Sequence, residues 1–347
     1  MLEYNNILLV RTDRIGDVIL TTPAMAVLKK AWPKARVSVL VSPATREIVE
    51  GNPHVAEVIV DDAKGEHQGI LGYWRLAGKI KRRRFDLAVV LHTKKRTNSL
   101  CFFAGIPERV GYANEKFGFF LTNKIPDVRP RGEKHEYQYC LDVLRHLGVS
   151  SADTPDLFFP LKESAERWAD EFILKNSLTH LKPLIAIHPD ASCISKRWPA
   201  DRFANVMSRL TERYSAKIIL VGGQSCQAIA REIKAKTYQP FLDVTGQTTI
   251  SQLASLLKRC HLLISNDSGP VHVAVAVGTP VISIFGRNQA GLSPTRWRPL
   301  GAHDAILHKE VGCEVCLAHN CVIDFECLTA IRPEDILGKI DALSKLW

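Results

Sequence analysis

Residues 262–286, LLISNDSGPVHVAVAVGTPVISIFG, set the architecture predicted for this chain. Apolar runs at 262–265 and 281–285 predict two buried strands. A polar turn and a helix separate them, because Gly269 suits a tight turn close to a ligand and Pro270 suits the first turn of a helix. Unpaired amides at such a helix start are a typical phosphate site. The segment therefore predicts a nucleotide site in the second half of the chain.

Strands and helices alternate through both halves of the chain. In the first half the pattern predicts strands at 7–10, 37–41, 58–60 and 87–91, with helices at 23–31 and 73–81. In the second half it predicts further strands at 184–187 and 217–221, with helices at 200–214, 226–236 and 250–260. Alternation of this kind favours parallel sheets covered by helices on both faces. The predicted fold class is therefore α/β, with doubly wound sheets.

The length of 347 residues exceeds one ordinary hydrophobic core, so we predict two domains. The first spans residues 1–165 and the second residues 182–347, with the last helix as a candidate to pack back on the first domain. The stretch at 150–160 is rich in turn formers, and a charged helix is expected at 164–175. We place the boundary between about residues 155 and 182.

The chain carries a net charge of +10, which favours anionic partners or, alternatively, only a solvated basic surface. It contains no run of about 18 apolar residues, as a membrane-spanning helix needs. The segment at 1–6 lacks the features of a signal peptide. We therefore expect a cytoplasmic protein whose nine cysteines are mostly reduced.

The loop after the first strand, RTDRIGD at 11–17, should lie at the carboxyl edge of a parallel sheet, where such folds bind ligands. Gly16 permits a close backbone approach, and Asp17 begins a helix. Asp17 is either a helix cap or a general base that points into a cleft between the two sheets. The loop lacks the G-x-G-x-x-G pattern, so it is not a dinucleotide fingerprint.

Three features of the second half add to the nucleotide site. The loop at 188–199 carries hydroxyls, such as that of Ser192, and the adjacent cations Lys196 and Arg197, which either neutralise a diphosphate or are solvated. Gly222 and Gly223 follow a strand and indicate a turn close to the ligand. The side chain of His272 either touches a phosphate or sugar, or packs locally.

Basic residues also cluster in the first half. Those at 79–84 end a helix, where cations suit the helix dipole. Lys94 and Arg96 follow a strand, so they are the candidates for binding an anionic acceptor. Nucleic acid is not expected, because no binding module with interleaved aromatic residues is recognisable.

Four cysteines near the carboxyl end, Cys313, Cys316, Cys321 and Cys327, are spaced C-x2-C-x4-C-x5-C. They could form a closed structural metal site, although the spacing differs from paired CxxC fingers. Buried thiols or a redox-sensitive pair are equally compatible with the pattern. A catalytic metal is not expected.

Three motifs occur together in this order: RTDRIGDVILTTPAMAVLKKAWP at 11–33, KRWP at 196–199, and SNDSGPVHVAVAVGTPVISIFG at 265–286. Together they resemble glycosyltransferase family 9, which contains the ADP-heptose:lipopolysaccharide heptosyltransferases. The resemblance covers nearly the whole chain, including FDLAVVLHTKKRTNSL at 85–100, ERVGY at 108–112 and LTAIRPEDIL at 328–337.

The resemblance implies a GT-B fold of two Rossmann-like domains that face each other across a cleft, the first binding the acceptor and the second the nucleotide sugar. It also implies an inverting, metal-independent transfer that requires no cofactor, with Asp17 as catalytic base. Arg11 corresponds to a basic residue near the active site and joins the acceptor candidates. The implied donor-phosphate residues are Lys196, Asp267, Ser268, Gly269, Pro270 and His272.

We therefore expect a glycosyltransferase that moves heptose from ADP-heptose to the phosphorylated inner core of lipopolysaccharide, bound peripherally to the inner membrane through its basic first domain. Departures from the family pattern keep alternatives open. Asp13 and Arg14 replace small polar residues, and Gln224 and Gln227 lie where relatives often offer an acidic residue to the ribose. The alternatives are a UDP- or GDP-sugar donor, a sugar-nucleotide epimerase, and a nucleotide-binding protein without turnover. No oligomeric state is predicted.

Overall fold

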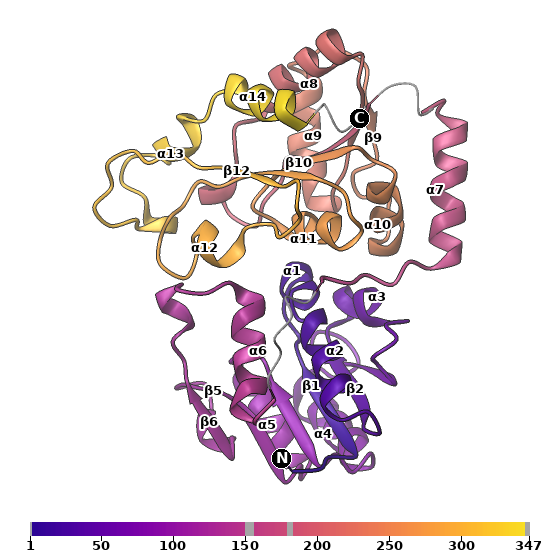
Figure 1. Cartoon of the computed structure of the whole chain (residues 1–347), viewed down its shortest axis with the longest axis vertical. Coiled ribbons are helices and arrows are strands. Elements are labelled where there is room, and N and C mark those ends of the chain that lie inside the picture. The colour runs from indigo at the N-terminus through magenta and orange to yellow at the C-terminus, as the bar shows by residue number, and fades with distance from the viewer. Residues whose placement is uncertain (1, 150–155, 179–182, 344–347) are drawn as a thin grey trace. The chain divides into compact units, whose positions relative to one another are not determined.

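Two six-stranded parallel sheets organise the chain in the computed structural model (Figure 1). The structure describes residues 2–149, 156–178 and 183–343. Contacts divide the chain into two units, Met1–Pro160 (unit 1) and Leu161–Trp347 (unit 2). The predicted boundary region includes residues 155 and 179–182, and the predicted turn-rich stretch includes 150–155; these lie outside the described residues.

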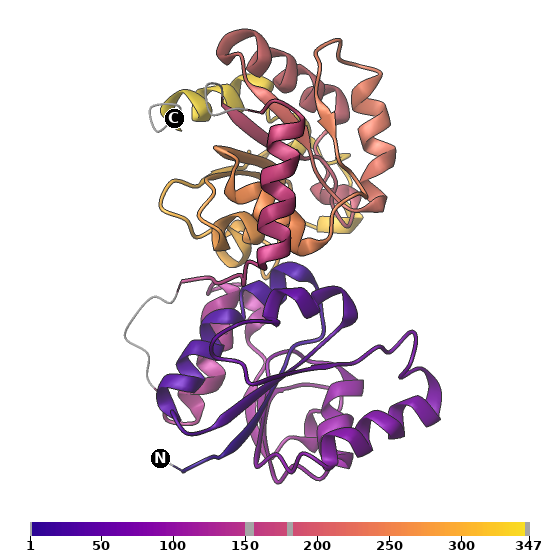
Figure 2. The ribbon, with the colours of Figure 1, turned by 90° about the vertical axis from the view of Figure 1, so that its right-hand side faces the viewer.

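The sheet of unit 1 has the order β3-β2-β1-β4-β5-β6, in which every pairing is parallel. Its strands are β1 (Asn6–Val10), β2 (Arg36–Val41), β3 (Glu57–Val60), β4 (Leu87–Val90), β5 (Glu108–Ala113) and β6 (Asn123–Pro126). Its helices are α1 (Ile15–Ile19), α2 (Thr22–Ala31), α3 (Arg46–Val49), α4 (Gly69–Lys81), α5 (Lys95–Phe103) and α6 (Glu136–His146). Helices cover both faces of the sheet (Figure 2), with α4 and α5 packed on one of them around Leu8 and Val90.

The sheet of unit 2 repeats this topology, with the order β12-β11-β10-β7-β8-β9. Its strands are β7 (Leu184–His188), β8 (Lys217–Leu220), β9 (Leu242–Asp243), β10 (Leu262–Asn266), β11 (Val281–Ile284) and β12 (Ala305–Leu307). Its helices are α7 (Glu163–Lys175), α8 (Ala200–Tyr214), α9 (Gln227–Lys234), α10 (Ile250–Lys258), α11 (Gly269–Ala276), α12 (Pro294–Trp297), α13 (Glu326–Thr329) and α14 (Pro333–Leu343). Strand order reverses beside β1 in unit 1 and beside β7 in unit 2, and ligands of Rossmann-like sheets bind outside the carboxyl ends of strands at such a switch point.

Two helices near the ends of unit 2 belong to it by their contacts. Helix α7 lies along α10, where Glu166 accepts hydrogen bonds from Lys258 and Arg259 at 2.9 and 3.0 Å. The last helix, α14, packs on α8 and β12 and buries Ile336 and Ile340 in the core of unit 2. None of the helices in the described parts of the chain is long and apolar enough to cross a membrane.

The expected α/β class is confirmed, and each predicted strand and helix is present with ends shifted by a few residues at most. Four strands were not predicted: β5, β6, β9 and β12. They lie towards the sheet edges, where a strand needs only partial burial and so lacks the apolar run of a central strand.

Candidate active site

In unit 1 a buried arginine gathers three carboxylates at the carboxyl edge of β1. Arg11 directly follows the strand and is only 2 % exposed. Its Nε donates to Asp13 at 2.9 Å, and its Nη2 donates to Asp17 at 2.7 Å and to Glu136 at 2.8 Å. Glu136 is the first residue of α6, so the cluster joins two ends of the unit's sequence. One cation thus faces three carboxylates.

Burial and the neighbouring carboxylates make Asp17 an unusually strong base for a carboxylate. Burial and the neighbouring charge of Asp13 raise its pKa to about 6; Arg11 opposes the rise and Glu136 adds to it. Burial acts in the same direction on Asp13, but there the charges of Arg11, His92 and Lys94 prevail and lower the pKa. The side chain of Asp17 remains 16 % exposed, so a substrate hydroxyl can reach it.

The alternative role of Asp17 as a helix cap is wrong. The cap of α1 is Arg14, and Asp17 is the third residue of the helix, where its side chain bonds to Arg11. Its carboxylate is therefore positioned by a tertiary ion pair, which is compatible with a role as general base.

The three cations expected to bind the acceptor differ in their partners. Arg11 is committed to its carboxylates, and Arg96 forms a two-pronged ion pair with Asp61 at 2.7 and 2.8 Å. Lys94 donates to the carbonyl oxygen of Thr12 at 3.0 Å, beside the Asp17 loop. Its hydrogen-bond partner is neutral, although its charge also acts on the nearby carboxylate of Asp13.

In unit 2 the polar turn between β10 and α11 is tied to the loop after β7. Asn266 accepts a hydrogen bond from the amide of Trp198 at 3.1 Å and donates to the carbonyl of Pro189 at 2.7 Å. The ammonium of Lys196 lies 2.7 Å from the carboxylate of Asp267 and also donates to its carbonyl at 3.1 Å. The structure thus brings Lys196 to the turn that begins α11, as the phosphate-site hypothesis requires.

Two further side chains at this turn were not singled out from the sequence. Arg287 is only 7 % exposed, and its guanidinium lies 3.8 Å from Asp267. His188 ends β7, and its Nδ1 lies 3.0 Å from the hydroxyl of Ser268; burial lowers its pKa to about 4, so the ring is neutral. The available signal was position alone, since both residues stand at or just after the carboxyl end of a strand.

Four of the remaining predicted donor residues lie at the same turn or in the first turn of α11, and Ser192 is on another loop. Ser268 precedes α11, whose first residues are Gly269 and Pro270. His272 lies in the first turn of that helix and is buried. Ser192 is exposed on the loop after β7.

The two glycines after β8 have different structural roles. Gly222 has a φ of +151°, and a Cβ there would lie 2.7 Å from the Cβ of Cys226 and 3.2 Å from His188. A Cβ on Gly223 would meet no atom within 4 Å. The conformation and close packing therefore require glycine only at position 222.

Gly222→Ala is expected to lower the free energy of unfolding by about 1–3 kcal/mol, because the added methyl group meets a strained backbone and the Cys226 side chain. Urea denaturation measures the loss. The matched control is Gly223→Ala, expected to change stability by less than about 0.5 kcal/mol. Equal stability of the two variants would contradict this assignment.

The four cysteines near the carboxyl end lie close to one another as free thiols. They line a cavity of about 440 Å³, and burial together with Cys316, Cys321 and Cys313 raises the pKa of Cys327 to about 11. In the described part of the chain, no group of three or more His, Cys, Asp or Glu residues is arranged to hold a metal ion. A structural metal at these cysteines stays a prediction without geometric support.

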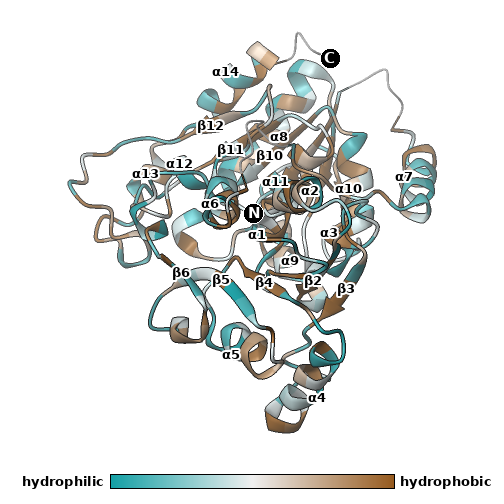
Figure 3. Ribbon diagram, turned by 60° about the horizontal axis from the view of Figure 1, so that its bottom comes forward, coloured by the Kyte–Doolittle hydropathy of each residue, from teal (hydrophilic) through white to brown (hydrophobic). Residues whose placement is uncertain are grey.

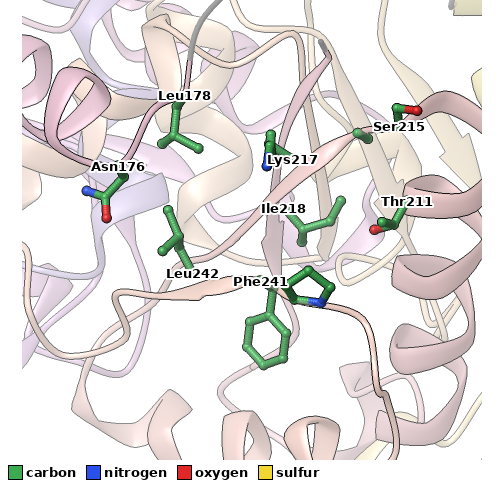
Figure 4. A pocket seen from close by; sticks show the side chains of 10 residues that line it. Asn176, Leu178, Thr211, Ser215, Lys217, Ile218, Phe241 and Leu242 are labelled. Atoms are coloured by element: carbon green, nitrogen blue, oxygen red, sulfur yellow. The ribbon is translucent and has the colours of Figure 1, made fainter.

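Another cavity, of about 300 Å³, lies beside the amino end of β8 (Figure 4). Asn176, Thr211, Lys217 and Leu242 contribute to its lining. The predicted phosphate residues follow the carboxyl ends of β7 and β10, so this cavity is separate from the phosphate turn.

Comparisons with known proteins agree with the fold and with these motifs. The family model of glycosyltransferase family 9 (heptosyltransferase) matches residues 73–325. A lipooligosaccharide heptosyltransferase 2 of Haemophilus ducreyi is 27% identical over 304 residues, covering 83% of this chain and 85% of the relative.

Solved structures extend the likeness to the whole chain. A family 9 glycosyl transferase from Veillonella parvula superimposes with a TM-score of 0.90 at 28% identity, over 99% of this chain and 98% of that one. The E. coli ADP-heptose lps heptosyltransferase II gives a TM-score of 0.78 at 22% identity, over 97% and 98%. The expected GT-B class is thereby confirmed, and the chain belongs to glycosyltransferase family 9 and is a glycosyltransferase.

Proposed function

We propose that this protein is an inverting heptosyltransferase that transfers heptose from ADP-heptose to the phosphorylated inner core of lipopolysaccharide. The observation that carries the catalytic part is the carboxylate of Asp17, held by Arg11 and given a pKa of about 6 by its surroundings. The sugar, nucleotide and acceptor are taken from relatives whose names state lipooligosaccharide or ADP-heptose.

Inversion requires one base on the side of the attacking hydroxyl. In the proposed reaction an Oδ atom of Asp17 removes the proton of the acceptor hydroxyl as its oxygen bonds to the anomeric carbon. The bond from that carbon to the donor's phosphate oxygen breaks on the opposite face, and ADP departs with the electron pair. With a pKa near 6, Asp17 is ionised at neutral pH yet basic enough to assist proton transfer.

The charge that develops on the departing diphosphate needs stabilisation. Lys196 is already oriented by Asp267, and the amides at the start of α11 are typical donors to phosphate oxygens. Arg287 adds a second buried cation beside Asp267. We propose that these groups bind the ADP leaving group and that no cofactor is required.

The proposed acceptor is attached to lipid, which places the reaction at the cytoplasmic face of the inner membrane. Lys94 is the residue that we propose contacts the acceptor's anionic groups, since its ammonium donates to the carbonyl of Thr12 in the loop that leads to Asp17. The position of the charge is compatible with a phosphorylated core sugar.

The identity of the nucleotide is tested by thermal denaturation with ADP, UDP and GDP in parallel. ADP is expected to raise Tm, since a ligand at 100 times its Kd adds about 2.7 kcal/mol to the free energy of unfolding. UDP and GDP serve as matched controls for the diphosphate. Stabilisation by either of them and not by ADP would overturn the heptose donor while leaving the transferase assignment intact.

A further inference from the structure

Unit 1 carries a group of exposed and half-buried aromatic and aliphatic side chains, which we call the aromatic surface. It comprises residues of α4, α5 and the segment around 117–120, namely Ile70, Leu71, Tyr73, Trp74, Phe102, Phe103, Phe117, Phe119 and Phe120. Figure 3 shows strongly hydrophobic positions at the amino end of α4, which α5 adjoins. Leu71 is 82 % exposed and Ile70 is 77 % exposed, although both are large apolar residues.

The rings form an unbroken series across three elements. Trp74 contacts Phe103 with ring centroids 5.0 Å apart, and Phe103 lies 5.2 Å from Phe102. Phe102 stacks on Phe120 at 4.4 Å, and Phe120 lies 4.4 Å from Phe119. Soluble proteins rarely leave a contiguous apolar patch of this kind uncovered unless it binds a partner.

Cations lie over several of the rings and in the adjoining sequence. Residues 69–84 contain six arginines and lysines and no carboxylate, and residues 94–107 contain three cations and no carboxylate. Lys95 lies over the ring of Phe117 at 5.5 Å, and Arg109 lies over Phe102 at 5.4 Å. The acidic residues closest to these segments in sequence are Glu66, Asp86 and Glu108, which lie just outside them. Two of the cations are paired with carboxylates, Arg83 with Glu57 and Arg96 with Asp61.

We infer that the aromatic surface docks unit 1 onto an anionic lipid bilayer, with Ile70, Leu71 and Trp74 inserted among the lipid headgroups. Tryptophan and phenylalanine beside aliphatic residues, flanked by lysine and arginine, are the composition of interfacial membrane anchors. Each cation near an anionic leaflet adds to the attraction. The inference rests on the proposed function only for the membrane-bound acceptor that gives docking a purpose.

Other occupants fit the surface less well. A second copy of the chain would bring the cations of residues 69–84 against the same cations. A single-stranded nucleic acid would use flat ring faces for stacking, but the most exposed members at the amino end of α4 are the aliphatic Ile70 and Leu71. A bilayer matches both the apolar side chains and their charge.

The test is sedimentation of the full-length protein with vesicles of phosphatidylcholine alone, or mixed with phosphatidylglycerol, without donor or acceptor. Binding is expected only to the anionic vesicles, and Leu71→Ser/Trp74→Ser should weaken it by about tenfold or more. Lys81→Gln/Arg82→Gln should weaken it about fivefold for each charge removed, and high salt should act in the same direction. The matched control is Leu174→Ser on α7, a leucine 75 % exposed in unit 2, which should leave binding unchanged.

A second measurement does not depend on the vesicle pellet. Lipids brominated in the acyl chain should quench tryptophan fluorescence of the wild type and should quench Trp74→Phe less, because that variant keeps an apolar ring at position 74. Three results would each overturn the inference. The Leu71→Ser/Trp74→Ser variant could bind vesicles as well as the wild type does, or the wild type could form a dimer that this variant does not form. The protein could also bind single-stranded RNA and not vesicles. If glycosyl transfer fails while vesicle binding behaves as expected, only the proposed function is wrong.

Discussion

Asp17→Asn is expected to lower kcat for glycosyl transfer about 100- to 10,000-fold, because general-base assistance contributes a factor of this size. The amide retains the shape of the carboxylate and can remain beside Arg11, but it cannot accept the proton of the attacking hydroxyl. Transfer from the nucleotide sugar to a soluble acceptor measures kcat, and equilibrium titration measures ADP affinity. ADP affinity should be unchanged, because Asp17 belongs to unit 1 and the proposed phosphate turn to unit 2.

The pH profile separates loss of a base from general damage. In the wild type kcat/KM should fall as the pH drops through about 6, where Asp17 becomes protonated. Asp13→Asn should move this fall to lower pH, because the charge of Asp13 raises the pKa of Asp17. Wild-type turnover in Asp17→Asn, or an acid limb that stays in place in Asp13→Asn, would contradict the assigned base.

Stability should change in the opposite direction from activity. The pKa of Asp17 in the folded protein, about 6, lies above its usual 3.8, so its ionisation favours unfolding. Protonated Asp17 contributes to the free energy of unfolding, and this contribution is fully present below about pH 4 and is lost as the pH rises through about 6. At pH 8 the free energy of unfolding of Asp17→Asn should therefore exceed that of the wild type by up to about 3 kcal/mol. At pH 4 it should not exceed that of the wild type. Urea denaturation at both pH values measures the difference.

Lys196→Gln is expected to lower kcat about 100- to 1,000-fold and to weaken ADP binding, because the substitution removes the preorganised positive charge that stabilises the leaving group. The substitution also deprives the buried carboxylate of Asp267 of its closest cation, since Arg287 lies 3.8 Å away. Some loss of stability is therefore expected. Steady-state kinetics and isothermal titration with ADP measure the two effects.

Two matched variants distinguish a phosphate role from a folding defect. Lys196→Gln/Asp267→Asn removes both charges and should recover stability without recovering transfer. Arg197→Gln removes the adjacent cation, which pairs with Asp190 at 2.9 Å and is 43 % exposed along its side chain, and should change kcat far less. Equal losses in Lys196→Gln and Arg197→Gln would contradict the assignment to Lys196.

Much of the fold was predictable because its signals are local. The central strands are buried on both faces, so β1, β7 and β10 appear as apolar runs, and α8 was predicted with the bounds observed, Ala200–Tyr214. The edge strands β6, β9 and β12, and β5 beside an edge, escaped prediction because their burial depends on neighbours distant in sequence. Within the site, positions in loops after strands made Asp17 and Lys196 candidates, and the resemblance to the family supplied the roles predicted for them.

Local sequence was thus enough to specify two Rossmann-like sheets and the loops at their carboxyl edges. Apolar runs mark the buried strands, and Gly269 and Pro270 determine the backbone conformation only of residues close to them. The pKa values and ion pairs of those loops depend on tertiary packing and could not be predicted from local sequence. Glu136 contacts Arg11 across 125 positions, and Arg287 approaches Asp267 from the loop after β11. A pKa depends on distances through space and on burial, which the order of residues alone does not contain. Only the folded chain therefore shows why Asp17 is basic and why Arg11 and Arg96 are already paired with carboxylates.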